Sequence, residues 1–181
     1  MKARGLYSEI KAFLGAKKIT SLDFAKQCAD EAATYVGLVE RTVQLSKQAD
    51  RDLEGLLKYL GAINSLPLLL SGYLCLSQTD FEKLLRATVA LYVRHTLVSN
   101  RNPLELESAY YDAAREIRAQ HSSTATSKKC LAQAKAILQK LNPSDSIVEE
   151  NAKELVLTRS ELHGSSPSSR TQCNRQPKKS G

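Results

Sequence analysis

The sequence lacks the short motifs that mark common catalytic and ligand-binding sites. It contains no glycine-rich phosphate loop and no HExxH, GxSxG or EF-hand pattern. Its four cysteines, at positions 28, 75, 130 and 173, are at least 43 residues apart. That spacing excludes a CxxC zinc site and the disulfide framework of a small secreted domain. We therefore expect no metal, cofactor or disulfide, and we interpret Cys28, Cys75 and Cys130 as small apolar residues of helices.

Histidines are few and isolated. His95, His121 and His163 have no second His or Cys within one helical turn, so none is a candidate metal ligand. Three acidic clusters lie opposite apolar stripes, with basic partners three or four residues away, as on solvated helix faces. The clusters are Glu105 with Glu107, Asp112 with Glu116, and Glu149 with Glu150. We predict no catalytic residue, so the chain as it stands is not expected to be an enzyme.

No segment predicts secretion or a membrane span. The N-terminal stretch MKARGLYSEIKAFLG mixes charges throughout and has no apolar signal-peptide core. The most apolar stretch, Leu56 to Leu76, is interrupted by Lys58, Asn64 and Pro67 before it could cross a bilayer. We expect a soluble cytoplasmic protein with free thiols and no membrane partner.

The basic charge is concentrated at the C-terminal end. The formal net charge is +7, and the segment Ser165 to Gly181 carries four basic residues and no acidic ones, which leaves +3 for the rest. The four are Arg170, Arg175, Lys178 and Lys179. The segment is rich in Ser, Pro and Gln, so we predict a disordered tail over 163–181 after a helical domain over 1–162. Such a tail favours weak non-specific DNA binding at most.

What the sequence does have is helical periodicity. Hydrophobic residues make up 42% and charged residues 25%, which is typical of globular proteins. Almost every periodic segment repeats every 3.6 residues and none alternates as a strand would. The sequence therefore predicts an all-α bundle of about seven to eight helices.

Capping and proline signals place these helices. Thr79 with Glu82 predicts a capping box, and Asn102 before Pro103 predicts a second start, so the short turn between these two helices favours an antiparallel pair. Pro67 either breaks the chain or stands in the first turn of its helix. The expected helices are Leu6–Leu14; one capped by Ser21 with the apolar face Phe24, Cys28, Ala32, Tyr35 and Val39; Leu53–Ile63; Leu68–Leu76; Thr79–Val98; one from Asn102 with the inward stripe Leu106, Tyr110, Ala113 and Ile117; one with Leu131, Ala134, Ile137 or Leu138, and Leu141; and Ser146–Leu162.

The pair Arg94–His95 interrupts the apolar helix Thr79–Val98, which we expect to be central and buried. Arg94 is predicted to bond a carboxylate or helix-end carbonyls, whereas His95 is expected at the surface. Lys83, Arg86 and Arg94 fall within about 80° of one another on this helix, and Arg101 extends that side. These four residues either pair with acids of the following helix, such as Glu105 or Glu116, or contact phosphates. Pairing is favoured, because no aromatic residues interleave with them.

Three segments in this order resemble the helical region of GmrSD-type restriction endonucleases. They are Pro67–Leu70, Leu91–Arg94 and Asn102–Ile117. A fourth segment, Ala152–Leu162, looks like the helix that precedes the C-terminal nuclease module of that family. The resemblance spans about Leu6 to Leu162. In that family the helical region joins a ParB-like nucleotide-hydrolysing module to an HNH-type nuclease.

The DGQQR-like motif of the first module and the HNH residues of the second are both absent here. The resemblance therefore implies a non-catalytic helical segment of a restriction or phage-defence nuclease, truncated or encoded separately. Its expected partners are the missing modules or another chain. The alternative is an unrelated soluble helical protein–protein interaction domain. We also expect the domain to expose an apolar surface left by its missing neighbours, with Leu66–Leu76 as a candidate segment.

Overall fold

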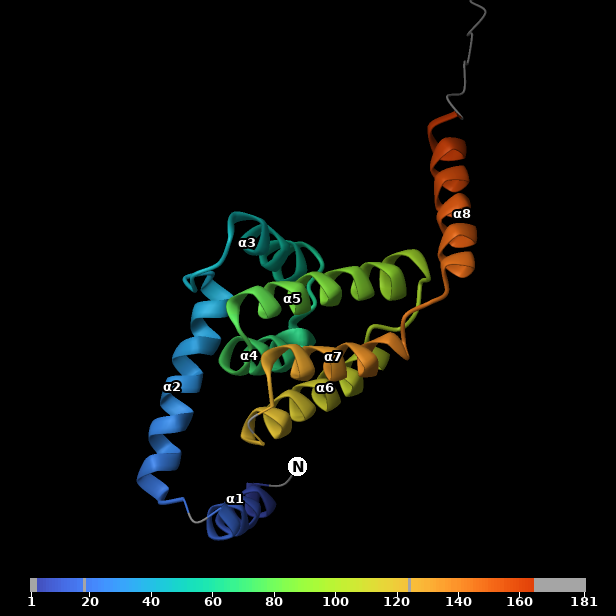
Figure 1. Cartoon of the computed structure of the whole chain (residues 1–181). Helices are drawn as coiled ribbons and strands as arrows, with labels where there is room; N and C mark the ends of the chain where they lie inside the picture. Colours follow the sequence, from blue (N-terminus) through green and yellow to red (C-terminus); the bar gives the residue numbers. More distant parts are fainter. Residues whose placement is uncertain (1–2, 18, 124, 165–181) are drawn as a thin grey trace, which may run out of the picture. The chain divides into compact units, whose positions relative to one another are not determined.

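The computed structural model describes residues 3–17, 19–123 and 125–164 of the chain (Figure 1). Within these ranges every regular element is helical, which confirms the all-α prediction. The α-helices are α1 Ala3–Lys17, α2 Ser21–Glu40, α3 Lys47–Glu54, α4 Leu66–Cys75, α5 Gln78–Tyr92, α6 Leu104–Ser122, α7 Ser127–Gln139 and α8 Asp145–Gly164. Two π-helical turns, η1 Gly55–Tyr59 and η3 Val93–Val98, continue α3 and α5, and a 3₁₀ turn, η2 Ile63–Ser65, precedes α4.

The chain divides into two compact units, Met1–Pro143 and Ser144–Gly181. The second unit contains α8 in its described part, close to the predicted bounds of that helix. The predicted basic tail lies outside the described residues beyond Gly164. The helices that pack together below all belong to the first unit.

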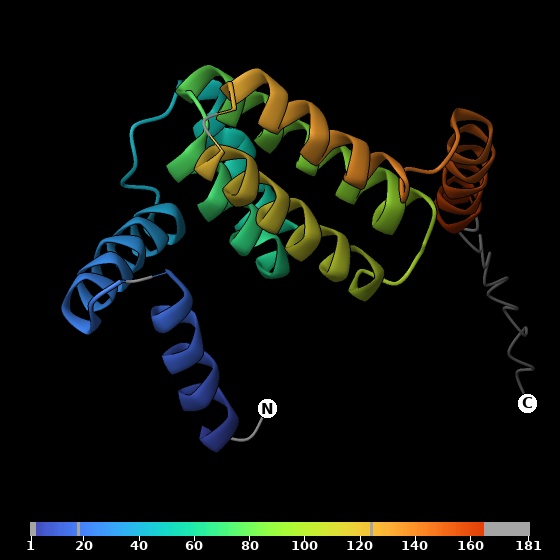
Figure 2. The ribbon, with the colours of Figure 1, turned by 60° about the horizontal axis from the view of Figure 1, so that its bottom comes forward.

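Four helices of the first unit form a ring in which α4 packs on α5, α5 on α7, α7 on α6 and α6 on α4. Figure 2 shows α6 and α7 running side by side. The helices α5 and α6, which we expected to pair, therefore stand across the diagonal of the ring. The connection from Val93 to Pro103 contains the π-helical turn η3 and a left-handed Asn100, and it is long enough to cross that diagonal.

The inward stripes of α6 and α7 follow the sequence pattern. Leu106, Tyr110, Ala113 and Ile117 are fully buried, as predicted. On α7 the structure decides between two alternatives, since Leu138 is buried and Ile137 is only partly buried.

Helix α4 is mostly buried, so the expectation that Leu66–Leu76 exposes an apolar surface is wrong for most of the segment, although Leu74 is 39% exposed. Leu66, Leu68 and Leu69 are buried, and Pro67 stands in the first turn. A Cβ at Gly72 would lie 2.7 Å from Leu84 Cδ2, so the missing side chain lets α4 approach α5 closely. The helix is buried on several sides because α2, α5 and α6 all pack against it.

Two helix starts differ from the expected ones. Thr20, not Ser21, caps α2 by accepting a hydrogen bond from the Asp23 amide at 3.1 Å. Ser77, not Thr79, caps α5 in the same way. Glu82 is then free to bind Ser46, whose amide and hydroxyl donate to its carboxylate at 3.0 and 2.9 Å, which ties the start of α3 to α5.

The predicted cap at Asn102 is present. Its side-chain oxygen accepts a hydrogen bond from the Leu104 amide at 3.0 Å, and α6 begins at Leu104, two residues after the predicted start.

Candidate functional site

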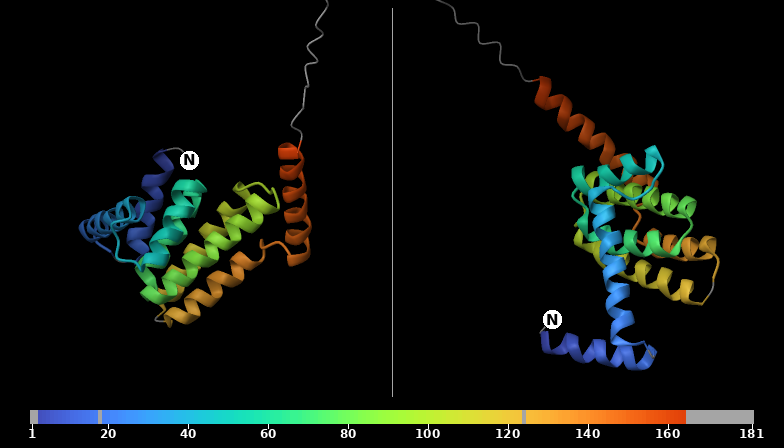
Figure 3. Two further views of the ribbon diagram at one scale, coloured as in Figure 1. Left: turned by 90° about the horizontal axis from the view of Figure 1, so that it is seen from above. Right: turned by 90° about the vertical axis from the view of Figure 1, so that its left-hand side faces the viewer.

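Helix α2 has an apolar side that nothing in the first unit covers. We call the outer face the residues of α2 that share this side and are exposed: Ala25, Cys28, Ala29, Ala32, Tyr35, Val36 and Val39. The exposed fractions of Tyr35, Val36 and Val39 are 41%, 48% and 47%. Figure 3 (right) views α2 from this direction, with the bundle behind it.

The outer face contains most of the apolar stripe expected for this helix. Of the five residues in that stripe only Phe24 is partly buried, and its ring lies 6.3 Å from that of Phe13 in α1. Cys28, expected as a small apolar residue of a packed helix, is exposed. The side of α2 that faces α4 instead contributes Leu38, which is fully buried, and the partly buried Glu31.

A salt bridge determines which side of α2 faces the bundle. Arg118 of α6 donates two hydrogen bonds, each 2.9 Å long, to the two carboxylate oxygens of Glu31. Its Nε also donates to Ser71 Oγ of α4 at 2.8 Å. The hydrogen bonds from Arg118 lower the pKa of Glu31, and those to Glu31 raise the pKa of Arg118. One guanidinium therefore joins α2, α4 and α6.

The C-terminal end of α2 is fixed separately. Arg41 ends the helix in the left-handed conformation, with φ 59°. Its guanidinium lies 3.2 Å from Asp50 and 2.7 Å from Glu54, both in α3. With both contacts in place, α2 is held along its inner side and the outer face points away.

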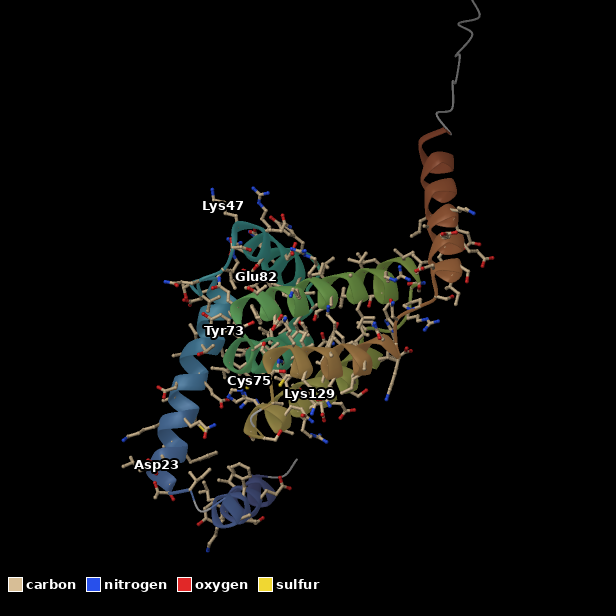
Figure 4. The ribbon with its side chains drawn as sticks, in the orientation of Figure 1. Asp23, Lys47, Tyr73, Cys75, Glu82 and Lys129 are labelled. Atoms are coloured by element: carbon tan, nitrogen blue, oxygen red, sulfur yellow. The ribbon has the colours of Figure 1, made fainter. Side chains whose placement is uncertain are left out.

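A groove of about 1140 Å³ separates α1 and α2 from α4 and α6. Phe13, Ile19 and Leu74 supply its apolar lining, and Arg118 and Cys75 lie on the bundle side. Figure 4 shows Asp23 at the α1 end of α2 and Cys75 at the end of α4. Burial raises the pKa of the Cys75 thiol, which makes it a poor nucleophile, and Arg118 is already occupied by Glu31. The groove thus offers contact surface, and neither Cys75 nor Arg118 is activated for chemistry there.

The four basic residues singled out in the sequence, Lys83, Arg86, Arg94 and Arg101, do not share a partner in the structure. Arg94 donates from Nε to Asn142 Oδ1 at 2.9 Å and from Nη2 to the Pro143 carbonyl at 2.8 Å. It is therefore structural as predicted, but its partners lie just beyond the end of α7 and are neither a carboxylate nor helix-end carbonyls. Lys83 lies 3.2 Å from Asp80, and Arg86 lies 3.9 Å from Asp52. Their acids belong to α5 itself and to α3, not to the following helix as expected. Arg101 is exposed. Phosphate contact by these residues stays a prediction.

His95 is buried, and the expectation of a surface position is wrong. Its side chain has no exposed area, and Nε2 lies 3.3 Å from Glu105 Oε2 without a well-formed hydrogen bond. Desolvation lowers the pKa of His95, while the nearby Glu105 carboxylate opposes that shift. Buried hydroxyls of Thr96, Ser99 and Tyr110 also lack a hydrogen-bond partner among the described residues. The sequence contained the signal, because His95 stands four residues after Leu91 and seven after Thr88, both buried.

Comparison with known proteins found no matching family model, no matching curated protein and no matching solved structure. In the described part of the chain no helix is long and apolar enough to cross a membrane. The same residues contain no group of three His, Cys, Asp or Glu side chains that could hold a metal ion.

Proposed function

We propose that this chain is a non-catalytic helical docking domain, and that the outer face of α2 is its docking surface. The exposed apolar stripe of α2 is the observation that supports this function. A helix at the surface of a soluble domain normally turns its apolar stripe to the core and its polar side to water. Here the inner side includes the salt-bridged Glu31, and the outer side includes Tyr35, Val36 and Val39.

Large exposed apolar patches on soluble proteins mark interaction sites, because leaving them in water is unfavourable. Helices α1 and α2 expose further apolar side chains: Tyr7 of α1 is 71% exposed and Leu22 of α2 is 65% exposed. Helices α1 and α2 therefore both present apolar side chains to water, and on α2 these share one side of the helix.

The pairing of charged side chains in the first unit supports a binding function over a catalytic one. Arg118 is bound to Glu31, Arg41 to Asp50 and Glu54, and Lys83 to Asp80. Groups that are paired in this way stabilise the packing of helices and are poorly placed to exchange protons with a substrate.

The more specific hypothesis, a segment of a GmrSD-type nuclease, remains a proposal from the sequence. The segments that carry the resemblance form α4, the junction of α5 with η3, and α6. Core packing in a helical bundle requires apolar residues at these positions whatever the family. The docking function proposed here does not depend on that membership.

A double substitution on the outer face tests the docking function. Val36→Lys with Val39→Lys should remove most hydrophobic-dye binding and concentration-dependent association of the purified chain, while circular dichroism stays helical. The matched control is Ile63→Lys, at a residue 64% exposed and away from α2. Unchanged association and dye binding in the folded double variant would rule out the outer face as the docking surface.

A further inference from the structure

Helix α7 and the residue that ends it carry four lysines without acidic partners. No Asp or Glu occurs between Glu116 and Asp145. Within the described residues none of the four lysines forms an ion pair, whereas Arg41, Lys83 and Arg118 are each bound to an acid. Their charges are therefore not used to hold helices together. The four are Lys128, Lys129, Lys135 and Lys140.

These lysines flank a strip of alanines on the outward side of α7. At about 100° per residue Lys128 and Lys135 leave the helix within roughly 20° of each other, and so do Lys129 and Lys140. The alanines are exposed and lie between the two pairs, and the opposite side of the helix is buried in the bundle. We call this surface the basic face: Lys128, Lys129, Ala132, Lys135, Ala136 and Lys140.

Two of the lysines stand where a helix disfavours them. Helix α7 begins at Ser127, so Lys128 and Lys129 lie in its first turn, which contains no acidic residue. Figure 4 labels Lys129. The N-terminal end of a helix carries partial positive charge and repels cations. An anion bound over this turn would relieve that repulsion. A residue choice that works against the local fold is typical of a functional position.

A cavity of about 220 Å³ lies between α5 and α7, beside the basic face. Lys135 lines it from α7 and Arg94 lines it from the end of α5, and Ala87 and Ala90 keep the α5 wall low. No acidic side chain is among the described residues that line it. An anion can therefore approach Lys135 from the cavity as well as from the outer side of α7.

We propose that the basic face binds the phosphate backbone of a nucleic-acid duplex without reading its sequence. This surface lies on a different helix from the outer face of α2, and the inference goes beyond the docking function proposed above. From Lys128 to Lys140 the face is about 18 Å long at about 1.5 Å per residue. A duplex strand has one phosphate for about every 3.4 Å of its axis, so the face spans about five phosphates of one strand.

The composition of the face favours a duplex over other anionic partners. A single strand binds by stacking its bases on aromatic side chains, and α7 contains none. A membrane surface or an acidic protein is held partly by large apolar residues between the charges, and here Ala132 and Ala136 occupy those positions. Lysines over a smooth face position a phosphate backbone and offer nothing that distinguishes one base from another.

Paired neutral substitutions in the full chain test the basic face. Lys128→Gln with Lys135→Gln removes two phosphate contacts. The dissociation constant for a DNA duplex of about 20 base pairs should rise about tenfold or more at about 0.1 M salt, and the salt slope should fall by roughly two. The control, Lys11→Gln with Lys47→Gln at exposed positions in α1 and α3, makes the same change in net charge and should alter the constant by less than about twofold. The basic segment Ser165–Gly181 is the same in every variant, so its contribution cancels.

Substitutions between the lysines give a second test that keeps all four of them. Ala132→Lys with Ala136→Lys should tighten duplex binding about tenfold, and Ala132→Glu with Ala136→Glu should weaken it by at least as much. Both positions are exposed, so circular dichroism should stay helical in both variants. Fluorescence anisotropy of a labelled duplex gives the constants.

Absence of duplex binding by the native chain would overturn the proposal, and so would equal weakening by the control pair, because net charge alone would then explain the binding. Tighter binding of a single strand of the same length would also overturn it. Lysine-dependent binding to phosphatidylserine vesicles or to polyglutamate, without binding to the duplex, would assign the basic face to a membrane surface or to an acidic protein instead. None of these results bears on the outer face of α2, which Val36→Lys with Val39→Lys tests separately.

Discussion

Arg118 and Glu31 are 87 residues apart in the sequence, yet two hydrogen bonds of 2.9 Å each join the guanidinium of one to the carboxylate of the other. The Nε atom of the same guanidinium donates to Ser71 Oγ. The three donor nitrogens therefore lie in one plane and point in fixed directions. Only arginine provides this planar fork. The orientation of α2, and with it the exposure of the outer face, depends on this contact.

Arg118→Lys should loosen α2 without unfolding the bundle. Lysine keeps the charge but cannot bind two carboxylate oxygens and Ser71 together. Because the Arg118 side chain is 38% exposed, screening limits the loss to about 1 kcal/mol of unfolding free energy. Amide hydrogen exchange within Ser21–Glu40 should become faster. Arg115→Lys, whose guanidinium lies 3.9 Å from Asp112, should leave exchange in α2 unchanged.

If Arg118→Lys left the exchange of α2 at the native rate, the packing of Leu38 and the Arg41 contacts would be sufficient to orient the helix. The role assigned to the salt bridge would then be wrong.

Periodicity was enough to predict the stripes of α6 and α7, because a bundle helix with one apolar stripe has only one way to bury it. It was not enough for α2. Tyr35 and Val39 show the same spacing as buried residues, and the decision between core and interface is made by Arg118, a distant partner that no local pattern reveals. The inner side of α2 is held by a charged pair, which a search for apolar spacing overlooks.

The errors at the helix starts have a different origin. Near α2 both Thr20 and Ser21 can accept from a later amide, and near α5 both Ser77 and Thr79 can. The sequence alone does not show which of two neighbouring Ser or Thr residues caps the helix. The spacing of Thr79 and Glu82 matches a capping box, but Glu82 binds Ser46, which is 36 residues away in the sequence.

Gly72→Ala should destabilise the bundle. The new methyl group would lie 2.7 Å from Leu84 Cδ2 and 3.3 Å from Phe81, both buried, so α4 and α5 must separate or repack. Overpacking of this size costs about 1–3 kcal/mol. Gly55→Ala is the matched control, because nothing lies within 4 Å of its added Cβ and its backbone is right-handed helical. That variant should be neutral or about 0.5–1 kcal/mol more stable in chemical denaturation. Equal stability of the two variants would contradict the close approach of α4 and α5.

Arg94→Ala should destabilise the junction of η3 with the end of α7. The substitution leaves Asn142 Oδ1 and the Pro143 carbonyl without the donors they now have, at a cost of about 1–3 kcal/mol. Arg94→Lys, which can replace one of these hydrogen bonds, should lose less. Urea denaturation of the two variants measures the difference. A native midpoint for Arg94→Ala would show that solvent replaces both bonds without cost.

Buried His95 should make the fold sensitive to mild acid. Desolvation lowers its pKa in the folded chain below the ordinary value of 6.5. Below about pH 6.5 the unfolded chain therefore binds more protons than the folded chain, and the free energy of unfolding falls as the pH falls. Of the charged groups that act on His95, Glu105 opposes the shift and Arg101 adds to it.

The window between pH 7 and 5 isolates His95 from the carboxylates. Asp80, Glu82, Glu31 and Glu54 also have lowered pKa values, but their ordinary values are 3.8 to 4.5, so their contribution is lost only at lower pH. Melting temperatures of the native chain should fall across this window. His95→Gln, neutral throughout, should remove most of that slope even if its stability at pH 7 differs. His121→Gln, at an exposed residue, should keep it. A native chain that became more stable from pH 7 to 5 would mean that Glu105 outweighs desolvation and that His95 is charged in the fold.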